Sequence, residues 1–156
     1  MNRNTKQLLI ALAIPLAAGG LGTLLSGGMD IFQTLNQPPL SPPGWFFPIV
    51  WSILYLLMGY ASYRIWTTQT EPVNARQALV FYAIQLFLNF LWPIVFFGFQ
   101  WYWAAFILLL VLWVFIYLTM HFFGNIDDTA ENLLIPYLLW VTFAGYLNLG
   151  VALLNT

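Results

Sequence analysis

Charged side chains are scarce in this sequence, and their scarcity argues against a soluble globular protein. Of 156 residues only 6% are charged, four basic and five acidic, whereas 62% are hydrophobic. A soluble domain carries about 25% charged residues, which solvate its surface. No charge at all occurs between Gln77 and Met120. The composition therefore indicates that lipid surrounds most of the chain.

Cysteine is absent and histidine occurs once, so the common metal and thiolate sites lack ligands. No disulfide can form, and the redox compartment stays open. His121 has no second histidine, cysteine or carboxylate at helical spacing, and we therefore predict no metal site. We interpret His121 as an interfacial side chain, with axial haem ligation as the alternative. A net charge of −1 gives no reason to expect nucleic acid binding.

Long apolar runs are what the sequence has instead, and five of them can cross a bilayer. A spanning helix needs about 20 apolar residues, because the hydrocarbon core is about 30 Å thick. In lipid each backbone amide must be bonded within its own segment, which favours helix. We predict an all-α membrane protein, a five-transmembrane-helix bundle in a single domain over residues 1–156. Its helices are expected at about 7–26, 45–66, 77–98, 101–123 and 132–153.

The first apolar run admits a second interpretation. Two basic residues precede a stretch from Leu8 to Leu25, as in a secretory signal peptide. The stretch is long enough to span, so we predict a retained helix, while small residues such as Ala17 and Gly19 leave cleavage as the alternative. Small residues four apart, such as Ala18 and Gly22, also favour close helix packing in lipid.

One connection is long and rich in proline. Residues 27–44 separate the first two predicted helices, and the run Gln37–Gly44 contains four prolines. Proline cannot continue a helix and stiffens the chain into extended turns. Long loops of this kind are often functional lids. We therefore predict a lid over one end of the bundle.

The basic residues indicate the orientation in the membrane. With five spans, the N-terminus and the loops at 67–76 and 124–131 share one side. All the basic residues fall on that side: Arg3, Lys6, Arg64 and Arg76. The positive-inside rule then predicts a cytoplasmic N-terminus, with the loop at 27–44 and the C-terminus outside.

Ionisable groups are missing from the interior of the predicted spans, which argues against a proton-coupled transporter. What remains are uncharged amides and aromatic rings at helical spacing, in the half of the bundle beneath the proline-rich loop. They lie on three helices: Trp51 and Tyr55 on the second, Gln85, Asn89 and Trp92 on the third, and Trp140, Ala144 and Asn148 on the fifth.

These residues have two interpretations. A tryptophan in a membrane helix often belongs to the interfacial belt or to packing, and an amide often makes only an interhelical hydrogen bond of about 0.6 kcal/mol. Their coincidence instead favours a pocket with aromatic walls and a few amide donors. Such a pocket would suit a large, flat, apolar ligand.

Several short segments keep a recognisable order and spacing from about residue 15 to the end. They are Pro38–Trp45, Val50–Trp51, Met58–Tyr60, Leu88–Pro93, Phe96–Gly98, Pro136–Trp140 and Leu147–Asn148. Together they resemble the tryptophan-rich sensory protein family, which includes the mitochondrial translocator protein or peripheral benzodiazepine receptor. The short polar ends are closer to a bacterial member, which implies the bacterial cell membrane.

The resemblance implies a bundle that binds porphyrins, sterols and synthetic isoquinoline or benzodiazepine ligands, commonly as a homodimer. Its pocket would open toward the loop between the first two helices. Carried over by position, the ligand-binding residues are Ser41, Pro42, Trp51, Asn89, Trp92, Trp103, Trp140, Ala144 and Leu147. The spacing pattern adds Gln85 and Asn148. The sterol segment near the C-terminus is not kept, because Leu149 stands where tyrosine is expected.

Three functions remain open on this basis. The first is a tetrapyrrole sensor or regulator that binds protoporphyrin IX or haem as a ligand and requires no cofactor. The second is light- and oxygen-dependent porphyrin breakdown, in which Trp51 and Trp140 would be redox-active or shield an intermediate. The third is a transporter of porphyrins or lipids. The expected partners are a hydrophobic small molecule, membrane lipid and a second copy of the chain.

Overall fold

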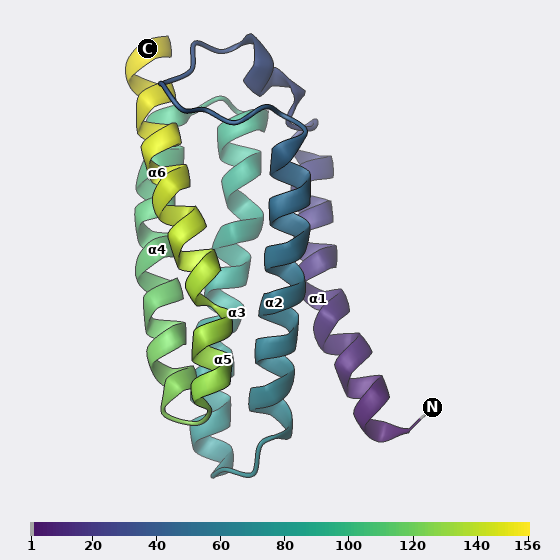
Figure 1. Ribbon diagram of the computed structural model, residues 1–156. Coiled ribbons are helices and arrows are strands. Elements are labelled where there is room, and N and C mark those ends of the chain that lie inside the picture. The colour runs from purple at the N-terminus through teal and green to yellow at the C-terminus, as the bar shows by residue number, and fades with distance from the viewer. Residues whose placement is uncertain (1) are drawn as a thin grey trace.

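The computed structural model describes residues 2–156 and contains helices but no β-strand in that range (Figure 1). Five helical segments are long and apolar enough to cross a membrane, which confirms the predicted fold class. The elements are α1 (Arg3–Leu25), α2 (Phe46–Thr67), α3 (Pro72–Pro93) with a π-helical turn (Ile94–Gly98), α4 (Tyr102–Gly124), α5 (Asp128–Leu133) and α6 (Ile135–Asn155).

The helices run along one common direction and alternate in sense. The linker between α1 and α2 and the C-terminus lie at one end, which we call the linker end (Figure 1). The N-terminus, the α2–α3 loop and the α4–α5 turn lie at the other, the loop end. Helix α1 packs against α2 and α3, and α4 packs against α3 and α6. The N-terminal turns of α1 diverge from the bundle.

Glycine allows the closest helix contacts. A Cβ at Gly59 of α2 would lie 2.7 Å from the Ala11 carbonyl oxygen of α1, and one at Gly22 would lie 2.8 Å from the Phe90 carbonyl oxygen of α3. In lipid, helix association depends on such close packing because the tails are as apolar as the side chains. Gly22 thus lies at a packed helix face, as its spacing predicts.

The third span begins earlier than the sequence indicates and ends differently. Helix α3 starts at Pro72 rather than near residue 77. Proline suits the first helical turn, because the N–H that it lacks would have no partner there. The α-helix ends at Pro93. Residues Ile94–Gly98, which we predicted as its last turn, form a π-helical turn instead.

The last span also begins earlier, near residue 128 rather than 132, and is broken. The Asp127 carboxylate accepts a hydrogen bond from the Thr129 N–H at 2.9 Å and caps the short helix α5. The chain then turns at Leu134, and Pro136 lies in the first turn of α6. The first span starts at Arg3 instead of near residue 7, since the Asn2 side chain caps it.

An ion pair fixes α5 against α2 at the loop end. The Arg64 guanidinium donates from Nε to Asp127 Oδ2 at 2.7 Å. Burial raises the pKa of Asp127, but hydrogen bonds from Arg64 and the Thr129 N–H oppose this. The net effect is a pKa below the ordinary value for a carboxyl group.

The linker lies across the end of the bundle and is anchored to α6. It contains one 3₁₀ helix, Asp30–Thr34, followed by the proline-rich run. The Tyr146 hydroxyl donates to the Pro39 carbonyl oxygen at 2.6 Å, and Asn155 Nδ2 donates to the Asn36 carbonyl oxygen at 2.8 Å. The predicted loop at 27–44 agrees closely with this linker, because α1 ends at Leu25 and α2 begins at Phe46.

Candidate ligand-binding site

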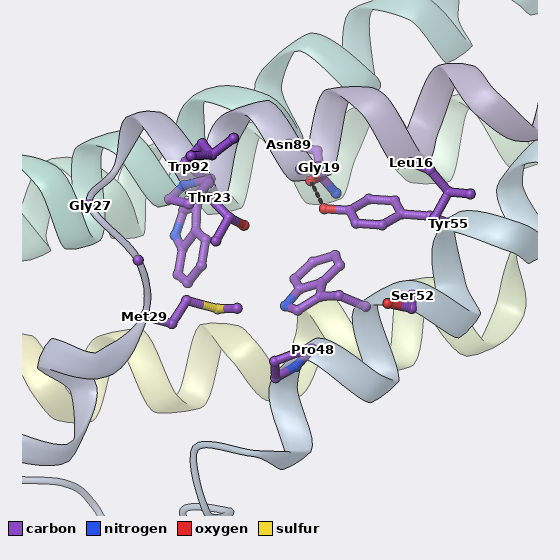
Figure 2. Close-up of a pocket in the computed structure, with 15 residues that line it drawn as sticks. Leu16, Gly19, Thr23, Gly27, Met29, Pro48, Ser52, Tyr55, Asn89 and Trp92 are labelled. Atoms are coloured by element: carbon purple, nitrogen blue, oxygen red, sulfur yellow. Dashed lines mark hydrogen bonds between the residues drawn. The ribbon is translucent and has the colours of Figure 1, made fainter.

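A cavity of about 580 Å³ lies beneath the linker, between α1, α2 and α3. Figure 2 shows Asn89 and Trp92 on one side of it and Met29 and Pro48 on the other. The lining is mostly apolar and aromatic. It comprises Leu16, Gly19, Gly20, Thr23 and Leu24 of α1, Gly27, Gly28 and Met29 of the linker, Pro48, Trp51, Ser52 and Tyr55 of α2, and Asn89, Trp92 and Pro93 of α3.

Glycines of α1 create much of this space. A Cβ at Gly20 would meet no atom within 4 Å, so this residue faces the open cavity. The preceding residue, Gly19, lets the Tyr55 ring lie directly against the α1 backbone. Gly27 and Gly28 have φ of 85° and 95°, a backbone conformation that favours glycine, and they turn the chain from α1 into the linker.

The cavity opens to the surface of the bundle between α1 and α2. Leu24 at its rim is 77% exposed, and Gly20, Pro48 and Ser52 are exposed as well. These rim residues carry no charge. A ligand can therefore reach the cavity from the side of the bundle as well as from beneath the linker.

A second, much smaller space lies between the linker, α2, α3 and α6. Its volume of about 30 Å³ is roughly that of one water molecule in the liquid. It is lined by Met29, Phe32, Phe47, Trp51, Trp92, Phe96, Phe97, Trp140, Ala144, Leu147 and Asn148. Met29, Trp51 and Trp92 line both spaces and form the partition between them.

Aromatic rings close the α6 side of the partition. The rings of Trp51 and Trp140 meet edge to face, with centroids 6.3 Å apart at 88°. Phe46 and Phe47 also contact the Trp140 ring, at 6.0 and 5.9 Å. The Trp140 Nε1–H is buried and donates to no group among the described residues. We expected one pocket among the second, third and fifth spans, but side chains fill most of the space beside α6 and the larger space lies toward α1.

A chain of hydrogen bonds runs from the cavity wall into the core, and we call it the polar column. The Tyr55 hydroxyl donates to Asn89 Oδ1 at 2.9 Å, as Figure 2 shows. Asn89 Nδ2 donates to the Tyr137 hydroxyl oxygen at 2.7 Å, and the Tyr137 hydroxyl donates to Gln85 Oε1 at 2.7 Å. Three helices, α2, α3 and α6, are thereby connected through uncharged polar groups.

A second set of hydrogen bonds fixes the Trp92 ring in the partition. Its Nε1–H donates to Asn148 Oδ1 at 3.0 Å, and Asn148 Nδ2 donates to the Tyr102 carbonyl oxygen at 2.9 Å. The Trp92 ring also stacks on Phe96, with centroids 5.0 Å apart. Groups of α4 and α6 and the π-helical turn therefore hold the Trp92 ring in place.

Comparison with known proteins identifies the chain. Residues 11–154 match the sequence model of the TspO/MBR family. The chain belongs to the TspO/MBR family. It is 38% identical to the tryptophan-rich protein TspO of Chlorobaculum tepidum over 99% of each chain. It is 39% identical to the tryptophan-rich sensory protein of Cereibacter sphaeroides, over 99% of this chain and 95% of the relative.

A more distant relative is the translocator protein of Ovis aries, which is 36% identical over 86% of this chain and 82% of its own. These matches confirm the resemblance inferred from the short segments. With five apolar helices, this TspO/MBR chain is an integral membrane protein.

The structure brings most of the predicted site residues of this TspO/MBR chain to one region. Trp51, Asn89 and Trp92 line the main cavity, and Trp51 and Trp92 also line the small one. The α6 residues line only the small space: Trp140, Ala144, Leu147 and Asn148. Gln85 lines neither space, because it is 1% exposed at the inner end of the polar column.

Besides Gln85, three predicted residues lie outside both spaces. Trp103 is 45% exposed, and its Nε1–H donates to the Thr156 hydroxyl at 3.0 Å. Ser41 donates to the Pro38 carbonyl oxygen within the linker, and Pro42 follows it. These side chains belong to the linker end of the TspO/MBR bundle, and their contact with ligand stays a prediction.

Sequence reasoning missed other wall residues. Thr23 and Gly19 line the cavity, but the small residues of the first span were interpreted as helix packing or as a cleavage site. Tyr137 joins Gln85 to Asn89, and a signal for it was present, since it precedes Trp140 by three residues and Ala144 by seven on one helical face. Met29 follows the two turn glycines and carried no signal.

His121 lies far from this region, at the loop end of α4. It is exposed, and its ring contacts Phe122 with centroids 5.4 Å apart. Within residues 2–156, histidine and acidic side chains form no group of three that could hold a metal ion. The polar atoms in the cavity are instead hydroxyls, amides and indole N–H groups.

Proposed function

We propose that this protein binds porphyrins and other flat hydrophobic ligands in the cavity beneath the linker and acts as a tetrapyrrole sensor or regulator. The observation that carries the proposal is the cavity of about 580 Å³, walled by Trp51, Trp92 and Tyr55. Small-molecule sites are usually about 300–1,000 Å³, mostly apolar, with a few fixed polar groups. This cavity has that size and that chemistry.

The aromatic walls favour a flat ligand. The Trp51 and Tyr55 rings stack with centroids 5.6 Å apart and an interplanar angle of 24°, and both line the α2 wall of the cavity. Aromatic pairs contribute about 0.5–1.5 kcal/mol beyond the area that they bury. The Trp92 ring lines the α3 wall of the same space. A planar macrocycle can contact both surfaces at once.

Acidic groups of such a ligand need water. No lysine or arginine lines the cavity, and an unpaired buried carboxylate costs many kcal/mol. The propionates of a porphyrin would therefore lie at the rim near Gly27 and Gly28, where the cavity is open. The ring itself would lie deeper, between Trp51 and Trp92.

The relatives and the charge distribution support the setting of this function. The name of the Cereibacter sphaeroides relative describes a sensory protein. All four basic residues lie at the loop end or on the helices that reach it. By the positive-inside rule the N-terminus would be cytoplasmic, with the linker end outside a bacterial cell membrane.

Fluorescence quenching tests the binding proposal. Titration of the full chain with protoporphyrin IX should quench tryptophan emission, because Trp51 and Trp92 lie within the occupied space. Trp51→Phe should reduce the quenched amplitude and weaken binding about fivefold, whereas Trp66→Phe, an exposed loop-end residue, should leave the affinity unchanged. Equal affinity for all three proteins would contradict this site.

Light- and oxygen-dependent porphyrin breakdown is the second candidate. The contact between Trp51 and Trp140, together with Tyr137 at 6.3 Å from Trp51, provides oxidisable rings next to the cavity. The bound porphyrin would absorb light, and dissolved oxygen would be the oxidant. Illumination of the complex should then bleach the porphyrin absorption faster than illumination of free porphyrin. Trp51→Phe or Trp140→Phe should slow the bleaching, and equal rates with and without protein would exclude this activity.

A further inference from the structure

The polar column has a direction. In the observed arrangement each donor points from the cavity toward the core: Tyr55 to Asn89, Asn89 to Tyr137, and Tyr137 to Gln85. The Tyr55 hydroxyl hydrogen is therefore engaged, and only its oxygen lone pairs remain for a group in the cavity. The side chain that ends the column decides this direction, because each hydroxyl in it can serve as donor or acceptor.

That last side chain is held on one side only. Gln85 is 1% exposed, its Oε1 accepts from Tyr137, and its buried Nε2 has no partner among the described residues. The neighbouring hydroxyl of Tyr82 is likewise buried without a partner. A half-turn of the Gln85 amide exchanges Nε2 with Oε1 at nearly constant shape, and no hydrogen bond donated by Nε2 opposes it.

The reversed column is chemically complete. It needs the Asn89 amide to turn over as well, because Oδ1 now faces Tyr55 and Nδ2 faces Tyr137. Gln85 Nε2 would then donate to the Tyr137 oxygen, Tyr137 would donate to Asn89 Oδ1, and Asn89 Nδ2 would donate to the Tyr55 oxygen. Both arrangements contain the same three links. They differ at the cavity, because in the reversed arrangement the Tyr55 hydroxyl hydrogen is free to donate to a ligand.

We propose that Gln85 is a positioning residue that sets the direction of the polar column, and thereby decides whether Tyr55 accepts from or donates to the ligand. The inference rests on the proposed function, since it concerns specificity at the same cavity. With Gln85 as observed, Tyr55 selects ligands that carry an N–H or O–H donor. A ligand with only acceptor groups must reverse the column to gain this hydrogen bond.

Gln85→Leu should reverse the column. The Tyr137 hydroxyl then has no acceptor on the core side, and a buried unpaired donor is costly. It donates to Asn89 instead, and Asn89 donates to Tyr55. The Tyr55 hydroxyl is then the only donor of the column without an acceptor in the protein. It lies at the cavity, where water or a ligand can accept its hydrogen. Gln85→Met, of closely similar length, provides a second variant if Gln85→Leu does not fold.

Raman spectroscopy can measure the direction of the hydrogen bonds in the polar column without any ligand. In the tyrosine Raman doublet, the intensity ratio rises when the phenol oxygen changes from donor to acceptor of a hydrogen bond. Ring-deuterated tyrosine incorporated at position 55 separates its signal from those of the other tyrosines. The ratio should rise in Gln85→Leu and stay at the parent value in Tyr82→Phe, which removes a neighbouring hydroxyl outside the column.

The affinities of two matched ligands test the effect of this direction on binding. Carbazole and fluorenone are flat three-ring molecules of similar size, but the first carries an N–H donor and the second a carbonyl acceptor. Relative to the parent, Gln85→Leu should shift the ratio of their affinities about fivefold toward fluorenone, the worth of one hydrogen bond. Tyr82→Phe should leave the ratio unchanged. In an Asn89→Leu background, Gln85→Leu should produce no shift, because the coupling passes through Asn89.

The outcomes separate this inference from the proposed function. An unchanged Raman ratio and an unchanged affinity ratio in Gln85→Leu would overturn the role of Gln85, even if both probes bind. The same shift in Tyr82→Phe or in the Asn89→Leu background would also overturn it. If neither probe and no porphyrin binds the parent protein, the proposed function fails, and the Raman measurement still decides the direction of the column.

Discussion

Single residues decide whether this bundle has a cavity. The main space exists because Gly19 and Gly20 leave one wall of α1 bare, while Tyr55 lies against that wall and binds Asn89. A larger residue has different effects at the two positions. At Gly19 it meets the Tyr55 ring, whereas at Gly20 it enters empty space.

Gly19→Ala should therefore displace Tyr55 and weaken its hydrogen bond to Asn89. Overpacking of this kind costs about 1–3 kcal/mol, so the midpoint of thermal unfolding in detergent should fall by several degrees. Gly20→Ala is the matched control, because it adds the same methyl group to α1 in open space, and it should unfold at the parent temperature or above it. Equal unfolding temperatures for the two variants would show that Tyr55 does not depend on the bare wall.

Individual side chains were only partly predictable from the sequence. Trp51, Asn89 and Trp92 were found because aromatic and amide residues at helical spacing stand out in a chain with few polar groups. Gln85 shares a face with Asn89 and was placed in the pocket, but four residues of helix carry it about 6 Å away from the cavity level. Sequence spacing gives the face of a helix, whereas depth relative to a cavity depends on the neighbouring helices.

At the scale of elements, capping and anchoring side chains fix the ends of the bundle. At the loop end, Asp127 caps α5 and pairs with Arg64 of α2. At the linker end, the Tyr146 hydroxyl and Asn155 hold the linker on α6. These contacts explain why α5 begins earlier than the apolar run indicates, since a capped polar turn precedes the span.

The Asp127 pair should make stability depend on acid. Because the folded pKa of Asp127 is lowered, its contribution is present at neutral pH and is lost as the pH falls from about 4 through the folded value. Asp127→Asn should lower the unfolding temperature at pH 7 by an amount that corresponds to about 1 kcal/mol or less. The difference between parent and variant should shrink as the pH falls below about 4, and a difference that grew in acid would contradict this account.

The linker anchors should control access to the cavity. Tyr146→Phe removes the hydrogen bond to Pro39 while leaving the ring, at a cost of about 1 kcal/mol. We expect faster association of protoporphyrin IX in stopped-flow fluorescence, with little change in unfolding temperature. Tyr117→Phe, an exposed tyrosine of α4, is the control and should associate at the parent rate. Unchanged association in Tyr146→Phe would indicate that ligand enters between α1 and α2 instead.

At the scale of the whole molecule, the five-helix membrane fold could be predicted from the sequence, because it depends only on the number and length of the apolar runs. Each span is an apolar run of about the length that crosses the hydrocarbon core. The location of the main cavity could not be predicted from the sequence, because it depends on which glycines of α1 face α2 and α3. The small residues of α1 predicted close packing. In the structure Gly22 packs closely against α3, whereas Gly20 borders the cavity.

The central claim is that a flat apolar ligand occupies the space between α1, α2 and α3. The most direct measurement is the protoporphyrin IX affinity of Gly20→Leu, because a Cβ at this position meets no atom within 4 Å and a longer side chain would extend into the cavity. Gly145→Leu is the matched control, because Gly145 lines a separate groove between α4 and α6. We predict binding about tenfold or more weaker for Gly20→Leu, equivalent to about 1.4 kcal/mol, with parent affinity for Gly145→Leu. Parent affinity in a correctly folded Gly20→Leu protein would contradict the account.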